Sequence, residues 1–227
     1  MQEDTVSIKS TGDGSHTLFN AKLNEHYHSV HGAKTESIHV FIKNGLELVH
    51  SENKPLRILE IGFGTGLNAF LTARFAHENQ RHIEYISLET FPLGPEITSG
   101  LAESYTANAD ELRLFNQIHE CPWDEISKIH PYFELYKKEK RIQDFNTEEK
   151  FNLIYFDAFA PDKQPEMWEP EIFAACFDWL ETEGILVTYC AKGQFKRNLK
   201  AAGFAVEARP GPPGKREMTI GRKLLSV

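Results

Sequence analysis

The chain has few cysteines and no long hydrophobic run. Of its 227 residues three are cysteine, at the scattered positions Cys121, Cys176 and Cys190. They form neither a disulfide framework nor the closely spaced pairs of a zinc site, and they suit a reducing, cytoplasmic environment. No apolar stretch reaches the roughly 18 residues of a membrane helix, and the polar, acidic N-terminus does not have the pattern of a secretory signal. The sequence therefore argues against a secreted disulfide-rich protein and against a membrane protein.

Metal-binding patterns are also missing, although the chain has ten histidines. Four of them occur close together in EHYHSVHGAKTESIH, at positions 26, 28, 31 and 39. The HExxH pattern, which places two histidines on one face of a helix, is absent. The sequence predicts no metal site.

Positive charge is scarce overall, because the net charge is −8, but it is concentrated at one end. Residues 188–227 contain nine lysines and arginines and two glutamates, so this segment carries +7 and residues 1–187 carry −15. A basic end on an acidic body can direct a polyanion to one face of a molecule. A solvated C-terminal surface explains the same pattern, so charge alone leaves both interpretations open.

Strand and helix patterns alternate along most of the chain. This alternation predicts an α/β fold with a doubly wound, mostly parallel, seven-stranded sheet, whose last strand is antiparallel because no helix precedes it. Residues 1–50 are expected to form an extension, with a hairpin at 5–20 and a helix at 34–48, that packs on a main domain at 51–227. The expected strands are 57–61, 82–89, 132–145, 151–157, 184–190, 204–209 and 217–225, and the expected helices lie at 66–78, 94–119, 169–181 and 192–203.

The first strand of the main domain runs into a glycine-rich loop, LEIGFGTGLN. Ligands of open α/β sheets bind beyond the carboxyl ends of the strands, and Gly62, Gly64 and Gly66 let the backbone turn tightly there. A nicotinamide-binding G-x-G-x-x-G loop would need glycine at position 67, where this chain has leucine. The observed spacing, with Glu60 in front, is the usual form in methyltransferases that use S-adenosyl-L-methionine, because an acid is favourable near the sulfonium and ammonium groups of that cofactor.

Two further acids favour a cofactor that contains a nucleoside. Glu89 ends the second strand 23 residues after Gly66, where a carboxylate accepts hydrogen bonds from ribose hydroxyls. Asp144 is expected at the end of the third strand, where an acid accepts a hydrogen bond from the adenine amino group. The simpler alternative is a structural loop with incidental acids, and it is the less favoured one.

The fourth strand ends in the stretch FDAFAPDKQPEMW, which begins at Phe156. It is a looser version of the Asp/Asn-Pro-Pro-aromatic loop of amine methyltransferases. An alkyl ammonium has a pKa of about 10.4 in water and must lose a proton before its nitrogen can attack a methyl group. Asp157 is therefore the candidate catalytic residue, which orients the amine and accepts or relays the proton. A structural or cofactor-binding role for Asp157 is the alternative, and Phe159 and Trp168 either stack on an unpaired base or form a hydrophobic lid.

Taken together, these segments resemble a known family. EIGFGTGLN, FDAFAPDKQPEMW, TYCAKG and AAGFAVEARPGPPGKREM, with DGSHTLFN and EHYHSVHGAKTESIHVFI near the N-terminus, are similar to bacterial tRNA 5-methylaminomethyl-2-thiouridine methyltransferases over nearly the whole chain. The resemblance implies methylation, by S-adenosyl-L-methionine, of the aminomethyl group on the wobble uridine in the anticodon loop of tRNA. In some bacteria this activity is fused to a flavin oxidoreductase. The chain resembles the stand-alone form, which implies a separate oxidoreductase or other aminomethyl-forming enzymes as partners.

The resemblance also implies roles for individual residues. Glu25, Tyr27 and His28 are expected to cover the methionine end of the cofactor. Gln143 occupies the position before Asp144 where the family commonly has glycine, and this departure weakens the expected contact of Asp144 with adenine. The expected cofactor-binding residues are Tyr27, Glu60, Gly62, Gly64, Gly66, Asn68, Glu89 and Asp144. The expected tRNA-binding residues are Phe159, Trp168, Lys192, Lys196, Arg197, Lys215 and Arg216.

Three other functions are open at this stage. An aminopropyltransferase similar to spermidine synthase shares the sheet and an aspartate loop, but it usually has Gly-Gly-Gly-Asp-Gly in the first loop, and the basic end of this chain would repel a polyamine. A methyltransferase for small-molecule amines is the second. An RNA-binding protein with an inactive cofactor fold is the third, and binding of S-adenosyl-L-methionine would distinguish it from an enzyme.

Overall fold

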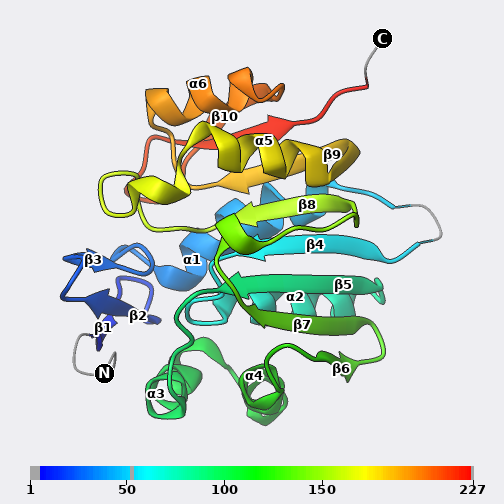
Figure 1. The fold of residues 1–227 in the computed structure, drawn as a ribbon. Coiled ribbons are helices and arrows are strands. Elements are labelled where there is room, and N and C mark those ends of the chain that lie inside the picture. Colours follow the sequence, from blue (N-terminus) through cyan, green and yellow to red (C-terminus); the bar gives the residue numbers. More distant parts are fainter. Residues whose placement is uncertain (1–5, 52–53, 226–227) are drawn as a thin grey trace.

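The fold is built around one mixed β-sheet with helices on both faces (Figure 1). The computed structural model describes residues 6–51 and 54–225. The eight strands of the sheet follow the order β10-β11-β9-β8-β4-β5-β7-β6. Their bounds are β4 (Leu56–Ile61), β5 (Ile83–Glu89), β6 (Ile126–His130), β7 (Phe133–Glu139), β8 (Phe151–Phe156), β9 (Leu180–Thr188), β10 (Ala205–Pro210) and β11 (Glu217–Arg222).

The strand directions confirm the predicted doubly wound, mostly parallel sheet. Strands β9, β8, β4, β5 and β7 are parallel to one another, and β11 is inserted antiparallel between β9 and β10. The predicted number of seven strands is wrong, because β6 adds an antiparallel strand at the edge next to β7. Most side chains of β6 are exposed or half-buried, so its residues lack the apolar alternation by which a strand is recognised.

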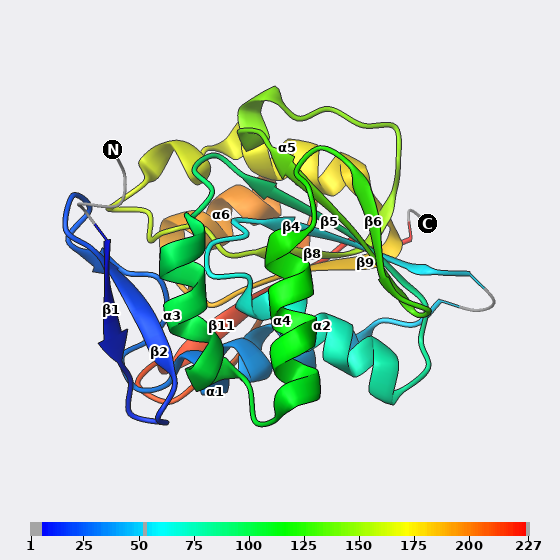
Figure 2. The same cartoon turned by 90° about the horizontal axis from the view of Figure 1, so that it is seen from below.

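Two hydrophobic cores lie on opposite faces of the sheet. Helices α1 to α4 cover one face, and α5 and α6 cover the other. Figure 2, the view from below, shows α3 and α4 nearest the viewer, beside α2. The helices are α1 (Ala33–Ser37), α2 (Leu67–Glu78), α3 (Pro95–Tyr105), α4 (Ala109–Glu120), α5 (Pro170–Trp179) and α6 (Gly193–Ala201). No helix within the described residues is long and apolar enough to cross a membrane.

The N-terminal segment forms a small antiparallel sheet of its own. It consists of β1 (Val6–Ser10), β2 (His16–Asn20) and β3 (Glu25–His26), which confirms the hairpin predicted at 5–20, except that residue 5 lies outside the described part. The helix predicted at 34–48 is divided into α1, a π-helical turn (Ile38–Lys43) and a 3-10 turn (Leu46–Leu48). Residues after β2 extend to the carboxyl ends of β4 and β8, where they line a cavity.

Candidate active site

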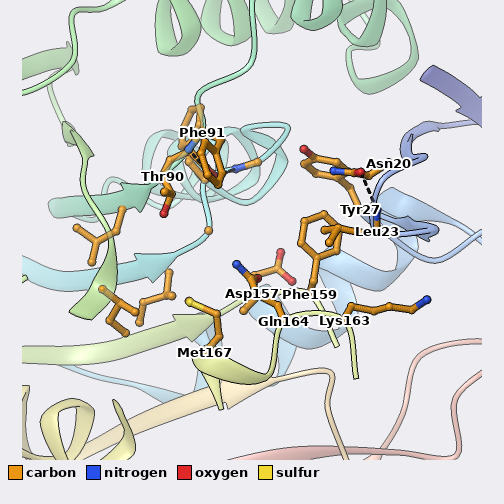
Figure 3. Close-up of a pocket in the computed structure, with 18 of the residues that line it drawn as sticks. Asn20, Leu23, Tyr27, Thr90, Phe91, Asp157, Phe159, Lys163, Gln164 and Met167 are labelled. Atoms are coloured by element: carbon orange, nitrogen blue, oxygen red, sulfur yellow. Dashed lines mark hydrogen bonds between the residues drawn. The ribbon is translucent and has the colours of Figure 1, made fainter. Parts of the chain in front are cut away.

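A cavity of about 650 Å³ lies where β4, β5 and β8 end (Figure 3). Five segments line it: the glycine loop after β4, the residues after β5, the residues after β7, the loop after β8, and the N-terminal stretch that follows β2. This is the edge at which open α/β sheets bind their ligands. Among the lining residues are Tyr27, His28, Gly62, Gly64, Glu89, Phe91, Asp157 and Phe159.

Gly62 brings the glycine loop into contact with the loop after β8. Its φ is +93°, and a Cβ at this position would lie 2.6 Å from the carbonyl oxygen of Asp157. The Asp157 amide in turn donates to the carbonyl oxygen of Ile61 at 2.9 Å. Only glycine tolerates both the left-handed conformation and this close approach. The loop predicted to bind the cofactor and the loop predicted to be catalytic are therefore fixed to each other through their backbones.

Glu89, the last residue of β5, lines the cavity. Its two carboxylate oxygens accept hydrogen bonds from the backbone amides of Gly64 and Phe91, both at 2.9 Å. Burial raises the pKa of Glu89, and these two amides act in the opposite direction. The carboxylate thus orders the glycine loop and borders the cavity.

Asp144 does not lie on this cavity. The expectation that it ends the third strand is wrong, because β7 ends at Glu139 and Asp144 lies in a 3-10 turn (Ile142–Asp144) with its side chain exposed. The Ile142 side chain is buried in the core below the turn, which leaves the aspartate on the outside. Lys140 and Ile142 line the cavity at this point.

Asp157 borders the cavity between the glycine loop and Phe159. Its Oδ2 accepts a hydrogen bond from Nδ2 of Asn68 at 2.8 Å. Burial raises the pKa of Asp157 to about 7, against the lowering effect of the Asn68 bond, and the nearby charges of Glu36 and Lys215 act in opposite directions. A carboxyl group with this pKa gains and loses its proton around neutral pH, as proton transfer from a substrate requires.

Glu60 and Asn68 lie behind Asp157 rather than on the cavity wall. Glu60 is 0% exposed and Asn68 is 2% exposed, and neither side chain lines the cavity. Successive side chains of a strand point to opposite faces, so Glu60 shares the α2 side of β4 with Ile58. The predicted direct role of Glu60 near the sulfonium group does not agree with this position.

The two aromatic residues of the loop after β8 have different environments. The Phe159 ring faces the cavity and meets the Tyr27 ring edge-on, with 5.0 Å between centroids. Trp168 is 5% exposed, packs edge-on against Phe195, and donates from Nε1 to the Phe159 carbonyl oxygen at 2.8 Å. Trp168 therefore holds the loop from the core side, and of the two aromatics only Phe159 is available to a substrate in the cavity.

Comparison with known proteins agrees with this geometry. The family described as S-adenosyl-L-methionine-dependent methyltransferase matches residues 133–224. The tRNA 5-methylaminomethyl-2-thiouridine biosynthesis bifunctional protein MnmC of Cupriavidus metallidurans is 30% identical over 220 residues, which are 91% of this chain and 32% of that protein. The structure of MNMC2 from Aquifex aeolicus matches with a TM-score of 0.77 and 26% identity, over 98% of this chain and 72% of that one. In sequence and in fold the chain is similar to the MnmC proteins.

The chain spans about a third of the length of the curated MnmC proteins that it matches. Spermidine synthase from Thermotoga maritima matches with a TM-score of 0.55 at 16% identity, over 97% of this chain and 70% of that one, and so it shares the fold alone. The cofactor predicted from the sequence, S-adenosyl-L-methionine, is the one named in the description of the matching family.

Most of the basic residues predicted to contact tRNA have partners within the described part of the chain. Lys192 pairs with Asp162, Lys196 with Glu217 at 2.8 Å, and Lys215 with Glu36 at 2.6 Å. Arg197 donates to the Gln194 side chain at 2.7 Å, and Arg216 is exposed. Three of these five cations are thus paired with carboxylates, and two of the carboxylates, Asp162 and Glu36, lie outside the C-terminal segment.

The Lys215–Glu36 pair supports the residues around the candidate active site. Glu36 is 5% exposed and also accepts from the Ser29 amide at 2.6 Å. The Lys215 Nζ lies 3.8 Å from the centre of the Tyr189 ring, and the Tyr189 hydroxyl donates to the Ala158 carbonyl oxygen at 2.8 Å. Sequence reasoning missed Glu36 and Tyr189, and its one signal was that both lie in segments carrying the family resemblance.

Replacing Lys215 with Met should destabilise the protein, because it leaves Glu36 buried without its cation. We expect a loss of about 2–3 kcal/mol in the free energy of unfolding, below the value for a fully buried pair because Lys215 is partly exposed. The double variant Glu36→Gln/Lys215→Met should recover most of the loss. Denaturant unfolding of the three proteins measures this. If Lys215→Met leaves stability unchanged and raises the KM for tRNA, Lys215 is a phosphate contact, as the sequence predicts.

Proposed function

We propose that this chain methylates the aminomethyl group on the wobble uridine of tRNA, converting 5-aminomethyl-2-thiouridine into 5-methylaminomethyl-2-thiouridine. The observation that carries the proposal is Asp157, a carboxyl group titrating near neutral pH between the glycine loop and a cavity-facing aromatic ring. The names of the MnmC relatives, which include tRNA 5-methylaminomethyl-2-thiouridine biosynthesis, supply the substrate. Because these relatives are described as bifunctional, an enzyme that forms the aminomethyl group, such as a flavin oxidoreductase, is the proposed partner activity.

Different residues of the cavity are proposed to have different roles in this reaction. S-adenosyl-L-methionine, when bound, supplies the methyl group. The donor set fits it, since Glu89 offers carboxylate oxygens to ribose hydroxyls and the glycine loop leaves room for the methionine part. Asp157 accepts the amine proton and aims the nitrogen, and Phe159 borders the space for the base. Most of the rate enhancement comes from holding nitrogen, carbon and sulfur in line.

Direct assay of the purified chain tests the proposal. The substrate is tRNA that carries 5-aminomethyl-2-thiouridine, incubated with S-adenosyl-L-methionine and then digested to nucleosides for mass spectrometry. Formation of the methylaminomethyl nucleoside is the expected result. Putrescine with decarboxylated S-adenosylmethionine is the control for the spermidine-synthase alternative. Aminopropyl transfer in the control, with no product on tRNA, would overturn the proposal.

The RNA contacts are proposed to lie at the rim of the cavity rather than mainly on the basic C-terminal segment. Lys22, Lys140 and Lys163 line the cavity from three different segments. Within residues 6–51 and 54–225 no carboxylate lies within ion-pair distance of any of them, and Lys163 donates to the Asn24 carbonyl oxygen at 3.1 Å. Phe91 borders the same cavity with 59% of its surface exposed. Unpaired cations beside an exposed aromatic ring suit the phosphates and bases of a single strand.

The triple variant Lys22→Gln/Lys140→Gln/Lys163→Gln should bind tRNA more weakly. We expect the KM for tRNA to rise at least about tenfold, and the slope of log K against log salt to flatten by about 2, since each phosphate contact on a single strand contributes about 0.7. The Kd for S-adenosyl-L-methionine serves as the internal reference. The matched control is Lys192→Gln/Lys196→Gln, whose lysines are already ion-paired and should matter less. Equal salt slopes for both variants would contradict this placement of the RNA.

A further inference from the structure

A buried polar cluster lies under the glycine loop, on the α2 side of β4. Glu60 and Ser87 are 0% exposed, and the Ser87 hydroxyl donates to Oε2 of Glu60 at 2.6 Å. Asn68, from the first turn of α2, donates to Oδ2 of Asp157 at 2.8 Å. Two carboxyl groups, Glu60 and Asp157, therefore lie on either side of one buried amide.

Two oxygen atoms in this cluster have no donor in the described part of the chain. They are Oε1 of Glu60 and Oδ1 of Asn68. The buried Tyr85 hydroxyl is also unpartnered, and both Asn68 and Tyr85 lie within hydrogen-bonding reach of Glu60. If Glu60 were ionised, the Tyr85 hydroxyl would donate to it, but Oδ1 of Asn68 would remain a buried acceptor without a donor, which costs about 1–3 kcal/mol. A proton on Oε1 lets Glu60 donate to Oδ1 of Asn68 while the Tyr85 hydroxyl donates to Glu60, so that all three atoms are satisfied.

We propose that Glu60 is kept in its neutral, protonated form and donates to Oδ1 of Asn68, so that Asn68 acts as a positioning residue that holds its amide group toward Asp157. The inference rests on the proposed function, since it assigns Asp157 as the carboxyl left free to exchange a proton with the substrate. Glu60 is the acid farther from solvent, whereas Asp157 borders the cavity, so the proton belongs on Glu60.

The groups around Glu60 support this assignment. Asp157 is the charged neighbour that acts on it, and a like charge disfavours ionisation of both. Tyr85 from β5 and Tyr155 from β8 are the other titratable neighbours, and Tyr155 pairs with Thr72 of α2. Burial raises the pKa of Glu60 to about 8, which agrees with a neutral acid below that pH.

The substitution Glu60→Gln tests the proposal because it copies the protonated acid. Its amide group donates to Oδ1 of Asn68 and its carbonyl oxygen accepts from Ser87. We expect Glu60→Ala to lower kcat at least tenfold and Glu60→Gln to restore it, with the acid limb of the pH profile at its wild-type position. Asn68→Ala should move that limb to higher pH, because Asp157 loses its donor. A limb that moves to lower pH by a unit or more in Glu60→Gln would show that Glu60 is normally charged and would overturn the proposal.

A second readout does not need the methyltransferase reaction. A buried acid whose pKa is raised on folding stabilises the protein below its unfolded pKa of about 4.3, and that stability is lost as pH rises toward the folded pKa. The folding constant of the wild type relative to Glu60→Gln should therefore fall with pH between about 4.5 and 8, by at most tenfold per unit. A ratio of the two folding constants that does not change with pH, or a Glu60→Gln variant that does not fold, would overturn the proposal that Glu60 is neutral. Failure of the tRNA assay would not affect this measurement.

Discussion

Replacing Asp157 with Asn should lower kcat for methyl transfer by about 10²–10⁴-fold. Asparagine keeps the size of the side chain and much of its hydrogen bonding, but it cannot accept the amine proton. The Kd for S-adenosyl-L-methionine should stay within a few fold, because Glu89 and the glycine loop are untouched. Single-turnover methylation of tRNA and equilibrium binding of the cofactor measure the two quantities separately.

The pH dependence of the same variant makes the test sharper. With the ionised form of Asp157 as the proposed proton acceptor, and its pKa at about 7, activity of the wild type should rise with pH through neutrality. The Asn variant should lose this limb, and its residual activity should climb only as free amine forms toward a pKa of about 10.4. Loss of cofactor binding with normal turnover of bound cofactor would make Asp157 a binding residue instead.

Glu89→Ala should have the largest effect on cofactor affinity. Two hydrogen bonds from ribose hydroxyls to a charged carboxylate contribute about 1.5–3 kcal/mol each, so the Kd for S-adenosyl-L-methionine should rise by at least about 100-fold. Part of the loss is indirect, because the amides of Gly64 and Phe91 lose their acceptor and the glycine loop loosens. Calorimetric titration of the cofactor into the purified protein measures the change.

Asp144→Ala is the matched control for Glu89→Ala. Both remove one acid at or beyond the carboxyl end of a strand of the same sheet, but Asp144 is exposed and off the cavity, so its removal should leave the Kd within about twofold. Equal Kd values for the wild type and Glu89→Ala would contradict the ribose assignment. A Kd that rises in Asp144→Ala as much as in Glu89→Ala would restore the adenine contact predicted from the sequence.

The sequence predicted those parts of the site that local chemistry determines. A glycine loop that follows a strand can adopt few backbone conformations. Because β8 pairs with β4 and the loop after β8 contacts Gly62, the position of Asp157 beside the glycine loop could be predicted. The boundary of β7 could not, because the polar run from Lys137 to Arg141 fits a strand or a turn equally well. The wrong prediction that Asp144 ends the third strand followed from placing the end of that strand at residue 145 instead of Glu139.

Contacts between distant segments were beyond the sequence. The ion pairs of Lys192, Lys196 and Lys215 join residues 30, 21 and 179 positions apart. One sequence shows an excess of basic residues but not which carboxylate faces each of them, so the sequence alone predicts tRNA contacts at lysines that are ion-paired in the fold. The direction of Glu60 was equally hidden, although strand alternation with Ile58 points it away from the cavity once β4 is fixed.

The place of β11 has a consequence for the synthesis of this protein. β11 lies inside the sheet, between β9 and β10, yet it is translated after every other strand. Until β11 leaves the ribosome, β9 has no partner strand on one edge. Glu36 also lacks its ion-pair partner Lys215, which is 179 positions downstream. Pairing over such a separation is slow to form and is completed late in folding. A growing chain that already has its glycine loop and Asp157 therefore lacks the support of the finished site until β11 and Lys215 have been synthesised.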